Sequence, residues 1–350
     1  MTARLRRFHG PWKLTDLATV PKTGLTAFSC FHCGGGSTMG YKLAGFTMLG
    51  GVEIDPEMMA IYRANHNPKH SYLMSVQQFN KLPLDELPDE LKGLDVLDGS
   101  PPCSVFSTAG KREKKWGSEH HFREGQQKQR LDDLFMHFIE VGQRLQPKVI
   151  VAENVKGLIF GNAKGYVKEI FAAFREASYD AQLFLFNAAR MGVPQARERT
   201  FFVARRQDLG LAPLKLAFNE PAIPFAEIKQ QGATQDLPST LMALWKQRQP
   251  KDVHVGMINQ RLNGKSSRFT TMIQQDYKPL YTITAGDQNI LYSEPRYLID
   301  KEILLGQTFP LDYNFCKAGV RYVCGMSVPP FMTQRIALEI ERQWFGQEYD

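Results

Sequence analysis

With 350 residues, 43% of them hydrophobic and 23% charged, the chain can bury a large core, which excludes a disordered, fibrous or disulfide-stapled miniprotein. Its formal charge of +7 suits a polyanionic partner, although 43 basic against 36 acidic residues is also typical of an ordinary solvated surface. The apolar runs 149–152 and 183–186 are far shorter than the roughly 20 residues of a membrane span, and the basic N-terminus leads into no apolar stretch. We therefore expect a globular protein that stays in the cytoplasm and meets no membrane.

Strand and helix patterns alternate in the first 206 residues. A β-rich run at 25–31 is followed by three glycines, a helical pattern at 37–43 and a second strand at 50–54. The remaining elements predicted here are strands ending at Asp98, Ala152, Phe186 and Ala204, and helices at 129–145 and 166–177. This alternation predicts an α/β fold with a doubly wound, mostly parallel sheet.

The alternation ends near Arg206, where prolines punctuate a segment without a sustained period. Between Lys246 and Lys278 there are seven Lys or Arg residues and two acidic ones, which indicates a second, smaller domain with local positive charge. After two prolines, apolar residues four apart predict a C-terminal helix that packs on the first domain. These residues are Met332, Ile336, Ile340 and Trp344.

Three glycines, Gly34, Gly35 and Gly36, stand between a strand and a helix, and Glu53 ends the next strand. Glycine lets a backbone turn approach a ligand closely, and a carboxylate at a strand end can accept both hydroxyls of a ribose. Because the pattern is not GxGxxG, it favours an adenosyl ligand over a dinucleotide. A tight turn beside a solvated acid is the alternative.

Cys103 lies in a polar loop, 99–107, directly after the strand that ends at Asp98. A thiol at the carboxyl edge of a parallel sheet lies where such folds bind ligands, and the two preceding prolines stiffen the loop. We predict that this thiol is a nucleophile rather than a small core residue.

Two further motifs flank strands. Glu153 follows the apolar run 149–152, where a charged carboxylate is costly unless it is paired or takes up a proton. Such a Glu would act as a proton donor or would bind the edge of a polar heterocycle. Arg197 and Arg199 precede the strand at 200–204, point to one face and suit a phosphate or carbonyl partner. Taken singly, each motif is also typical of a surface ion pair.

Together the motifs are more specific. Cys103 within PCxxFS, the triplet 153–155 and the Gln195-x-Arg197-x-Arg199 motif follow the glycine-rich opening in this order, and the sequences at 306–310 and 325–330 precede the last helix. In these motifs most of the chain resembles the C5-cytosine DNA methyltransferases.

The resemblance implies a Rossmann-like, S-adenosyl-L-methionine-dependent fold and a division of the chain into three parts. These are a basic extension at 1–23, a catalytic and cofactor-binding domain at 24–206 plus 320–350, and a small DNA-recognition domain at 207–319 with its target recognition region at about 207–285. It further implies that the partner is double-stranded DNA and that the protein is a monomer without a bound metal. The host would be a bacterial or phage-infected cell, and the existence of a partner restriction endonuclease stays open.

The resemblance also implies a mechanism. C5 of cytosine is too weak a nucleophile to take a methyl group directly, so Cys103 adds to C6 of a base that is flipped out of the duplex. Glu153 holds the N3 and N4 edge and protonates N3, Arg199 binds O2, and Arg197 holds nearby backbone. The residues implied to contact DNA are Ser107, Lys111, Arg112 and Gln195. The basic stretch 111–130 is either a mobile loop that contacts the DNA backbone or a solvated charged face.

The implied cofactor residues include several departures from the family pattern. They are Phe31, His32, Cys33, Gly34, Gly35, Gly36, Glu53, Ile54, Ser75, Val76, Pro102, Met326 and Ser327. His32 and Cys33 replace a small residue and a glycine, Ser29 replaces an Asp, Ser75 replaces the Asp that contacts adenine, and Met326 replaces an Asn. We expect Cys33 to crowd or reshape the site.

Three interpretations of the departures stay open. S-adenosylmethionine binds in an altered pose, the donor is a modified analogue whose added carboxylate meets His32, or transfer is lost while DNA binding persists. A redox or metal pair at Cys30-x-x-Cys33 is less favoured because a second CxxC is missing. A zinc deaminase would need PCxxC and HxE motifs, which the sequence lacks. RNA is a lesser alternative to DNA.

Overall fold

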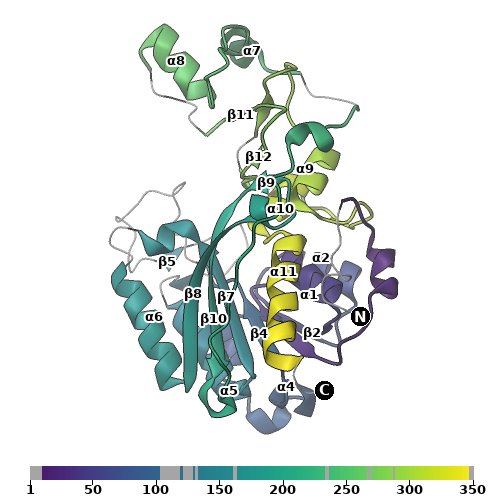
Figure 1. The fold of residues 1–350 in the computed structure, drawn as a ribbon, viewed down its shortest axis with the longest axis vertical. Coiled ribbons are helices and arrows are strands. Elements are labelled where there is room, and N and C mark those ends of the chain that lie inside the picture. The colour runs from purple at the N-terminus through teal and green to yellow at the C-terminus, as the bar shows by residue number, and fades with distance from the viewer. Residues whose placement is uncertain are drawn as a thin grey trace.

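A seven-stranded sheet forms the centre of a large lobe, and a small lobe, residues 225–307, stands at one end of it (Figure 1). The computed structural model describes residues 10–102, 133–160, 164–232, 236–265, 267, 270–286 and 288–346, together with the backbone of two short strands at 119–120 and 129–130. Within these ranges, every helix is too short or too polar to span a bilayer.

The chain builds the sheet outward from its centre, first in one direction from β1 and then in the other from β4. Their order is β3 (His70–Leu73), β2 (Thr47–Glu53), β1 (Thr26–Cys30), β4 (Val96–Gly99), β7 (Val149–Val155), β10 (Glu198–Arg206) and β8 (Tyr179–Asn187). The pairs from β3 to β7 are parallel, and β10 is antiparallel to both of its neighbours. This arrangement confirms the predicted α/β fold, and the carboxyl ends of β1, β2, β4 and β7 meet at one edge, where open α/β sheets bind ligands.

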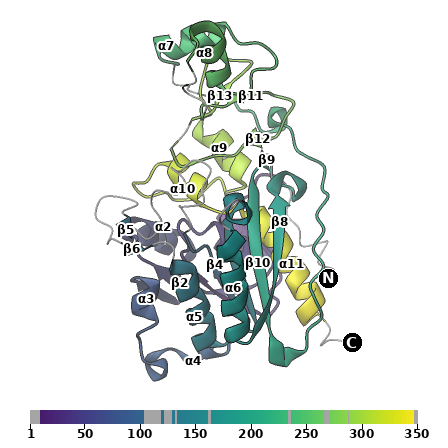
Figure 2. The same ribbon diagram turned by 90° about the vertical axis from the view of Figure 1, so that its left-hand side faces the viewer.

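Helices cover both faces of the sheet, so its strands are apolar on both sides. One face carries α1 (Gly36–Leu43), α2 (Pro56–His66) and α11 (Pro330–Ile340), and the other carries α3 (Val76–Phe79), α4 (Asp89–Lys92), α5 (Leu134–Leu145) and α6 (Lys164–Glu176). The short helix α10 (Val320–Met326) lies at the end of the sheet next to the small lobe (Figure 2). Successive residues alternate between the two cores: Ala27 and Val151 pack on the α1 face, whereas Phe28 and Ala152 pack on the α5 face.

Some predicted elements differ at their ends. The helix predicted from residue 129 begins only at Leu134, and Gln129–Arg130 forms a short strand, β6, paired with β5 (Glu119–His120). The sequence analysis missed α2 and β3, although α2 carries clear start signals: Asp55 accepts hydrogen bonds from the backbone N–H of Glu57 and Met58, and Pro56 opens the first turn. The predicted C-terminal stripe is buried against the large lobe.

The N-terminal extension packs into the large lobe from Trp12 onward. Trp12 is 2% exposed, its Nε1 donates to the carbonyl oxygen of Thr308 at 2.9 Å, and its own carbonyl oxygen accepts from the amide of Leu311 at 2.9 Å. Phe309 and Tyr313 belong to the same core. Residues 12–20 and 308–313 are therefore parts of the large lobe, which differs from the domain boundaries expected at 23 and 319.

Residues 207–224, which we call the connector, run along β8 and the C-terminal helix before the small lobe begins. The side-chain amide of Gln182 donates to the carbonyl oxygen of Leu214 at 3.1 Å, and Trp344 Nε1 donates to that of Ala212 at 2.9 Å. Further along, Glu220 pairs with Arg335 at 3.0 Å. The small lobe thus starts near Phe225 rather than at 207.

The small lobe has its own apolar core at the tip. Its elements are α7 (Ser239–Lys246), α8 (Val255–Asn263), β11 (Ile273–Gln274), β12 (Leu280–Tyr281), β13 (Ile290–Leu291) and α9 (Asp300–Gln307). Leu241, Ile258 and Ile290 lie in the tip core, whereas Ile283 and Ile303 near the base join the core of the large lobe.

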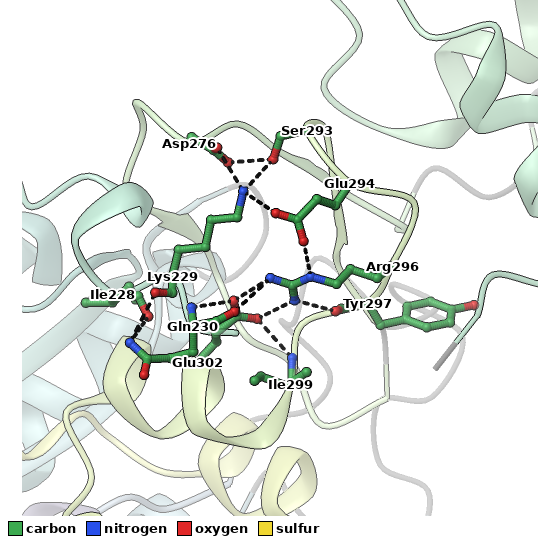
Figure 3. Close-up of polar contacts among 10 residues, drawn as sticks. All are labelled: Ile228, Lys229, Gln230, Asp276, Ser293, Glu294, Arg296, Tyr297, Ile299 and Glu302. Atoms are coloured by element: carbon green, nitrogen blue, oxygen red, sulfur yellow. Dashed lines mark hydrogen bonds and ion pairs between the residues drawn. The ribbon is translucent and has the colours of Figure 1, made fainter. Parts of the chain in front are cut away.

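A buried ion pair fastens both ends of the small lobe (Figure 3). Glu302, fully buried on α9, accepts two bonds from the Arg296 guanidinium at 2.9 Å each, and also accepts the amides of Gln230 and Ile299 at 3.0 Å. Arg296 in turn donates to the carbonyl oxygens of Gln230 and Tyr297. We call Arg296 and Glu302 the clamp, because they join the chain entering the lobe to the chain leaving it.

Beside the clamp, Lys229 holds together the turns that follow β11 and β13. Its ammonium group lies 3.1 Å from Asp276 and 2.6 Å from Glu294, and donates to the Ser293 hydroxyl at 2.8 Å. Glu294 also accepts from Arg296, so the two cations share one acid (Figure 3).

Candidate active site at the carboxyl edge of the sheet

A sharp turn at residues 31–36 joins β1 to α1. Phe31, Cys33 and Gly35 all have positive φ, at 55°, 47° and 76°, and the turn is closed by the Gly35 amide, which donates to the carbonyl oxygen of His32 at 2.8 Å. Gly36 is required by close packing, because a Cβ there would overlap the carbonyl oxygen of Val328. The glycines therefore fit the turn against the C-terminal segment, which the sequence did not reveal.

Glu53 ties the end of β2 to this turn. Its carboxylate is 8% exposed and accepts from the amides of Cys33 at 3.0 Å, Ile54 at 2.9 Å and Asp55 at 3.0 Å. Burial raises the pKa of Glu53, and the hydrogen bonds to Asp55, Cys33 and Ile54 oppose the shift. A carboxylate held in this way lies beside the turn, where the sequence places the ribose acid.

Asp98, at the end of β4, organises the floor below the turn. It accepts from the hydroxyls of Ser29 at 2.8 Å and Ser37 at 2.7 Å, and Ser29 lies directly opposite it in the register of β1 and β4. Burial raises the pKa of Asp98 to about 6 against these hydrogen bonds. An Asp at position 29 would place a second carboxylate there, so Ser29 avoids a like-charge contact and supplies a donor.

His32 points into the protein interior. Its ring stacks on Tyr62 with centroids 3.7 Å apart, its Nδ1 lies 3.1 Å from the carbonyl oxygen of Cys33, and the side chain is 4% exposed. A Cβ on Gly51 would meet the ring at 2.6 Å, so that glycine makes room for it. Burial lowers the pKa of His32 to about 4, and the ring is neutral at pH 7. A neutral, interior ring gives no support to a carboxylate-bearing donor, and its Nε2 has no hydrogen-bond partner among the described residues.

Cys33 does not pair with Cys30. Cys30 lies in the core on the α5 face, whereas Cys33 packs against the core on the α1 face, with its Sγ 3.6 Å from Met58 Sδ. Both are free thiols, and burial raises the pKa of Cys33 to about 12. The geometry contradicts the redox or metal pair that was the minor interpretation of this CxxC.

Four other expected cofactor residues lie in two places, two of them just after β3 and two where α10 ends. Ser75 caps α3 by accepting from the Gln78 amide at 3.1 Å, and Val76 is 2% exposed in the core, so both support the end of β3 from within. Met326 is 45% exposed, whereas Ser327 beside it is 3% exposed and lies against Gly34 and Gly36.

Glu153 and Arg199 form an ion pair across β7 and β10. Arg199 Nε lies 2.8 Å from Glu153 Oε1, and the two side chains are 15% and 12% exposed. Burial lowers the pKa of Arg199, while Glu153 opposes the shift. Asn154, the next residue, donates from its side chain to the carbonyl oxygen of Pro101 at 3.0 Å, which fixes the start of the loop that carries Cys103.

Gln195 and Arg197 lie inside the protein, in what we call the hub. The Gln195 side chain is fully buried and donates to Gln307 at 2.7 Å and to the carbonyl oxygen of Gly306 at 3.1 Å, while it accepts the Ile283 amide at 3.0 Å. These contacts correct the expected role of Gln195: its amide faces the protein and not DNA.

Arg197 bonds the same region from the other side. Its Nη1 donates to the carbonyl oxygen of Ile283 and its Nη2 to that of Gly325, both at 2.9 Å, and the residue is 2% exposed. Burial, and then neighbouring Arg199, hold the pKa of Arg197 well below its ordinary value. Arg197 therefore joins two protein segments, and its burial does not suit the expected catalytic contact. Of the two arginines, Arg199 is the one that pairs with Glu153.

Four expected site residues, Cys103, Ser107, Lys111 and Arg112, lie outside the described residues. Pro102 is the last described residue before the nucleophile candidate and is partly buried.

The sequence analysis missed a buried polar chain behind the glycine turn. Tyr313 donates from its hydroxyl to the carbonyl oxygen of Gly34 and lies 3.0 Å from His66 Nε2, while Lys42 Nζ lies 3.3 Å from His66 Nδ1. These residues come from three separate segments, and the sequence gives no motif that joins them. The start signal of α2, which carries His66, was the one available clue.

The chain is similar to known proteins in sequence and in fold. The family described as C-5 cytosine-specific DNA methylase matches residues 25–342. The chain is 27% identical to the type II methyltransferase M1.HphI of Haemophilus parahaemolyticus, over 89% of this chain and 86% of that protein. It is 32% identical to the type II methyltransferase M.FnuDI of Fusobacterium nucleatum, over 54% of this chain and 49% of that protein.

A solved structure shares the fold. It is described as a candidate DNA modification methyltransferase encoded within an E. coli prophage, and it matches with a TM-score of 0.67 and 17% identity over 91% of this chain and 99% of that one. With the family match extending over most of its length, the chain belongs to the C-5 cytosine-specific DNA methylases.

Proposed function

We propose that the protein methylates C5 of cytosine in double-stranded DNA through a covalent adduct at Cys103. The observation that carries the proposal is the Glu153–Arg199 pair, 2.8 Å apart at the carboxyl edge of the sheet, next to the loop that Asn154 fixes at Pro101. A carboxylate and a guanidinium held together present an acceptor or acid beside a donor, which matches the N3, N4 and O2 edge of cytosine.

The residues of the edge suit S-adenosyl-L-methionine as the donor. Glu53 supplies a buried carboxylate for the ribose hydroxyls, and the turn 31–36 lies against it through the Cys33 amide. Phe31, Ile54, Pro102 and Ser327 border the same region in our proposal. When bound, S-adenosyl-L-methionine would supply an electrophilic methyl group.

The chain's own residues prepare the cytosine. The Cys103 thiolate adds to C6 while Glu153 delivers a proton to N3, and Arg199 stabilises O2, so that C5 gains the electron density needed to attack the methyl group. After transfer a base, which we take to be water, removes the C5 proton, the C6–S bond breaks to release the Cys103 thiolate, and N3 returns its proton to Glu153. Arg197 acts here as a positioning residue that holds the hub.

The reaction requires the base to leave the helical stack. Unstacking costs a few kcal/mol, and contacts with the DNA backbone offset it. We assign these contacts to the basic stretch 111–130, with Ser107, Lys111 and Arg112, and to the small lobe.

Mass spectrometry of nucleosides tests the function. Purified protein is incubated with S-adenosylmethionine and with duplex DNA or RNA, and we expect 5-methylcytosine in the DNA from the wild type but not from Cys103→Ser. Duplex DNA that contains 5-fluorocytosine should trap a covalent complex only when Cys103 is present. Product formation by Cys103→Ser would contradict the mechanism, product in RNA alone would change the substrate, and another C5-alkyl cytosine would change the donor.

A further inference from the structure

A chain of four polar groups crosses the interior behind the glycine turn. It runs from Lys42 on the last turn of α1, through His66 at the end of α2, to Tyr313, and ends at the carbonyl oxygen of Gly34. His66 is 7% and Tyr313 6% exposed, so water does not compete readily with these bonds. The chain begins and ends on one continuous segment, because Gly34 immediately precedes α1.

The direction of each hydrogen bond is fixed by its partners. The Lys42 ammonium can only donate, so it occupies the lone pair of His66 Nδ1, and burial keeps the pKa of His66 well below its ordinary value. The neutral ring therefore carries its proton on Nε2 and donates it to the Tyr313 oxygen. The phenol proton is then directed to the Gly34 carbonyl oxygen.

The same pair lies directly against the next residue of the turn. A Cβ on Gly35 would meet His66 Cδ2 at 2.9 Å and the Tyr313 hydroxyl at 3.2 Å. Gly35 is left-handed, with φ of 76°, and its amide closes the turn on His32. Tyr313 thus bonds the Gly34 carbonyl oxygen, and His66 and Tyr313 together fill the space that a side chain at position 35 would need.

The turn needs this support because two of its residues are not glycine. Phe31 and Cys33 have φ of 55° and 47°, a conformation that costs energy for any residue with a Cβ. Such a conformation persists only when its surroundings impose it. The Glu53 carboxylate holds the Cys33 amide from one side, and Tyr313 holds the Gly34 carbonyl from the other.

We propose that Tyr313, oriented by His66 and Lys42, is a positioning residue that keeps the 31–36 turn in its cofactor-binding conformation. This inference rests on the proposed function, because the turn is taken to bind S-adenosylmethionine. Tyr313 acts through Gly34 and touches neither substrate nor donor.

Removal of one hydroxyl tests the inference. In Tyr313→Phe we expect the Kd for S-adenosylmethionine, measured by calorimetry on the full chain, to rise about tenfold, as loss of one buried hydrogen bond predicts. At saturating donor we expect kcat to stay within twofold of the wild type, and the Kd for duplex DNA to be unchanged.

A matched control separates positioning from general stability. Tyr179 also donates from a buried hydroxyl to a backbone carbonyl oxygen, that of Pro147 at 2.6 Å, but at the opposite edge of the sheet. We expect Tyr179→Phe to lower the free energy of unfolding by a similar amount and to leave the Kd for S-adenosylmethionine within twofold. Equal donor affinity in Tyr313→Phe and Tyr179→Phe would overturn the inference alone.

The tautomer of His66 gives a second test. The side-chain amide of His66→Gln places a donor near Nε2, so we expect its donor affinity to be close to that of the wild type, whereas His66→Leu should match Tyr313→Phe. Equal affinity of His66→Gln and His66→Leu would contradict the relay. A wild-type protein that does not bind S-adenosylmethionine would overturn the proposed function and this inference with it.

Discussion

Glu153 and Arg199 are each removed from most of their water and lie 2.8 Å apart. A buried charge that loses its partner is left uncompensated, which costs more than the pair itself contributes. Each residue therefore compensates the buried charge of the other when no substrate is bound. In the proposed reaction the pair also places an acid and a donor on one edge of the base.

The first prediction at the residue scale concerns Glu153→Gln. The amide keeps the shape of the side chain but loses the charge and the transferable proton, so we expect kcat to fall roughly 10²- to 10³-fold. The measurement is methyl transfer to duplex DNA at saturating donor. Glu90→Gln is the control, because Glu90 pairs with Lys69 on the surface of the large lobe, and it should keep kcat. Full activity in Glu153→Gln would refute the assignment.

The second prediction concerns pH and His32. The pKa of His32 is about 4 in the folded protein and 6.5 in the unfolded chain, so only the unfolded chain gains a proton as pH falls from 6.5 to 4. Its contribution to stability is complete above pH 6.5 and is lost toward pH 4, by roughly 3 kcal/mol. Urea unfolding of the wild type and His32→Ala should show their difference in free energy shrinking by this amount.

The comparison of variants isolates His32 from its neighbours. Asp98 has the opposite sign, because its raised pKa of about 6 makes the fold more stable as pH falls below that value. His66 has the same sign as His32. Both groups remain in His32→Ala, so their effects cancel in the difference apart from the part of the His66 shift that comes from His32 itself. A constant difference across pH would disprove the prediction.

At the residue scale, the sequence predicted the position of the candidate residues in the sheet better than the orientation of their side chains. Glu53, Glu153 and Arg199 lie at the edge where strand ends predicted them. His32, Gln195 and Arg197 were expected to face ligands but point inward, because a polar residue in a motif looks the same whether its partner is a ligand or a backbone carbonyl. Only the packing of distant segments distinguishes the two.

At the scale of elements, α1 and α11 pack closely through small residues. A Cβ on Gly40 of α1 would meet Thr333 Cβ at 2.5 Å and the carbonyl oxygen of Pro330 at 2.6 Å. Backbone atoms cannot yield as a flexible side chain can, so this helix contact depends on glycine. The contact matters for the candidate site because α1 begins at the glycine turn, residues 31–36.

We predict opposite effects of alanine at two helical glycines. Gly40→Ala should lower the free energy of unfolding by about 1 to 3 kcal/mol through overpacking, although alanine is the better helix former. Gly165→Ala, in α6, meets nothing within 4 Å and should raise stability by up to about 1 kcal/mol. Denaturant unfolding measures both, and a stable Gly40→Ala would show that α1 and α11 can separate.

Elements with strong periodicity were predicted from the sequence, and weak ones were missed. Strands β1, β4, β7 and β10 are apolar on both faces and so appear as continuous runs. The edge strand β3 has only four residues, none of them buried, and carries no such pattern. Its neighbour α2 was not predicted, although its buried residues at 58, 59, 61, 62 and 66 follow helical spacing.

At the scale of the whole molecule, α9 connects the two lobes. Glu302 near its first turn belongs to the clamp, and Gln307 at its end belongs to the hub, where it donates to the carbonyl oxygen of Ser327 at 2.7 Å. A helix of eight residues is about 12 Å long and bends little. The anchoring of the small lobe is therefore transmitted directly to the segment that packs on the glycine turn.

We predict that the clamp determines the stability of the small lobe. Glu302→Gln removes the fully buried carboxylate from Arg296 and leaves only the more exposed Glu294 as its acid, so it should cost up to about 3 to 5 kcal/mol. We expect limited proteolysis to cut the small lobe first, and urea unfolding followed by the fluorescence of Trp245 to shift to lower urea. Glu339→Gln, which changes a pair with the 57% exposed Arg342, should cost at most about 1 kcal/mol. Equal effects of the two variants would contradict this role.

The presence of two lobes was evident from the loss of alternation after residue 206, but their boundary was not. Apart from a single 3₁₀ turn at Gln207–Leu209, the connector has no regular secondary structure. Its contacts with Gln182 and Trp344 span 32 and 132 positions of the sequence. Irregular chain that packs on a distant helix has no periodic signature. For the same reason Trp12 was assigned to a separate extension.

The clamp has a practical consequence for exchanging target preference between relatives. Both crossings of the chain into the tip are anchored at Gln230 and Arg296 through one carboxylate. A foreign insert spliced between 231 and 292 would keep the clamp and would have to supply the backbone groups that Ile283 gives to the hub, whereas a splice at 207 would also replace the connector that lines β8. We expect chimaeras of the first kind to remain active and to modify the insert donor's sites, and those of the second kind to be recovered mainly as aggregates.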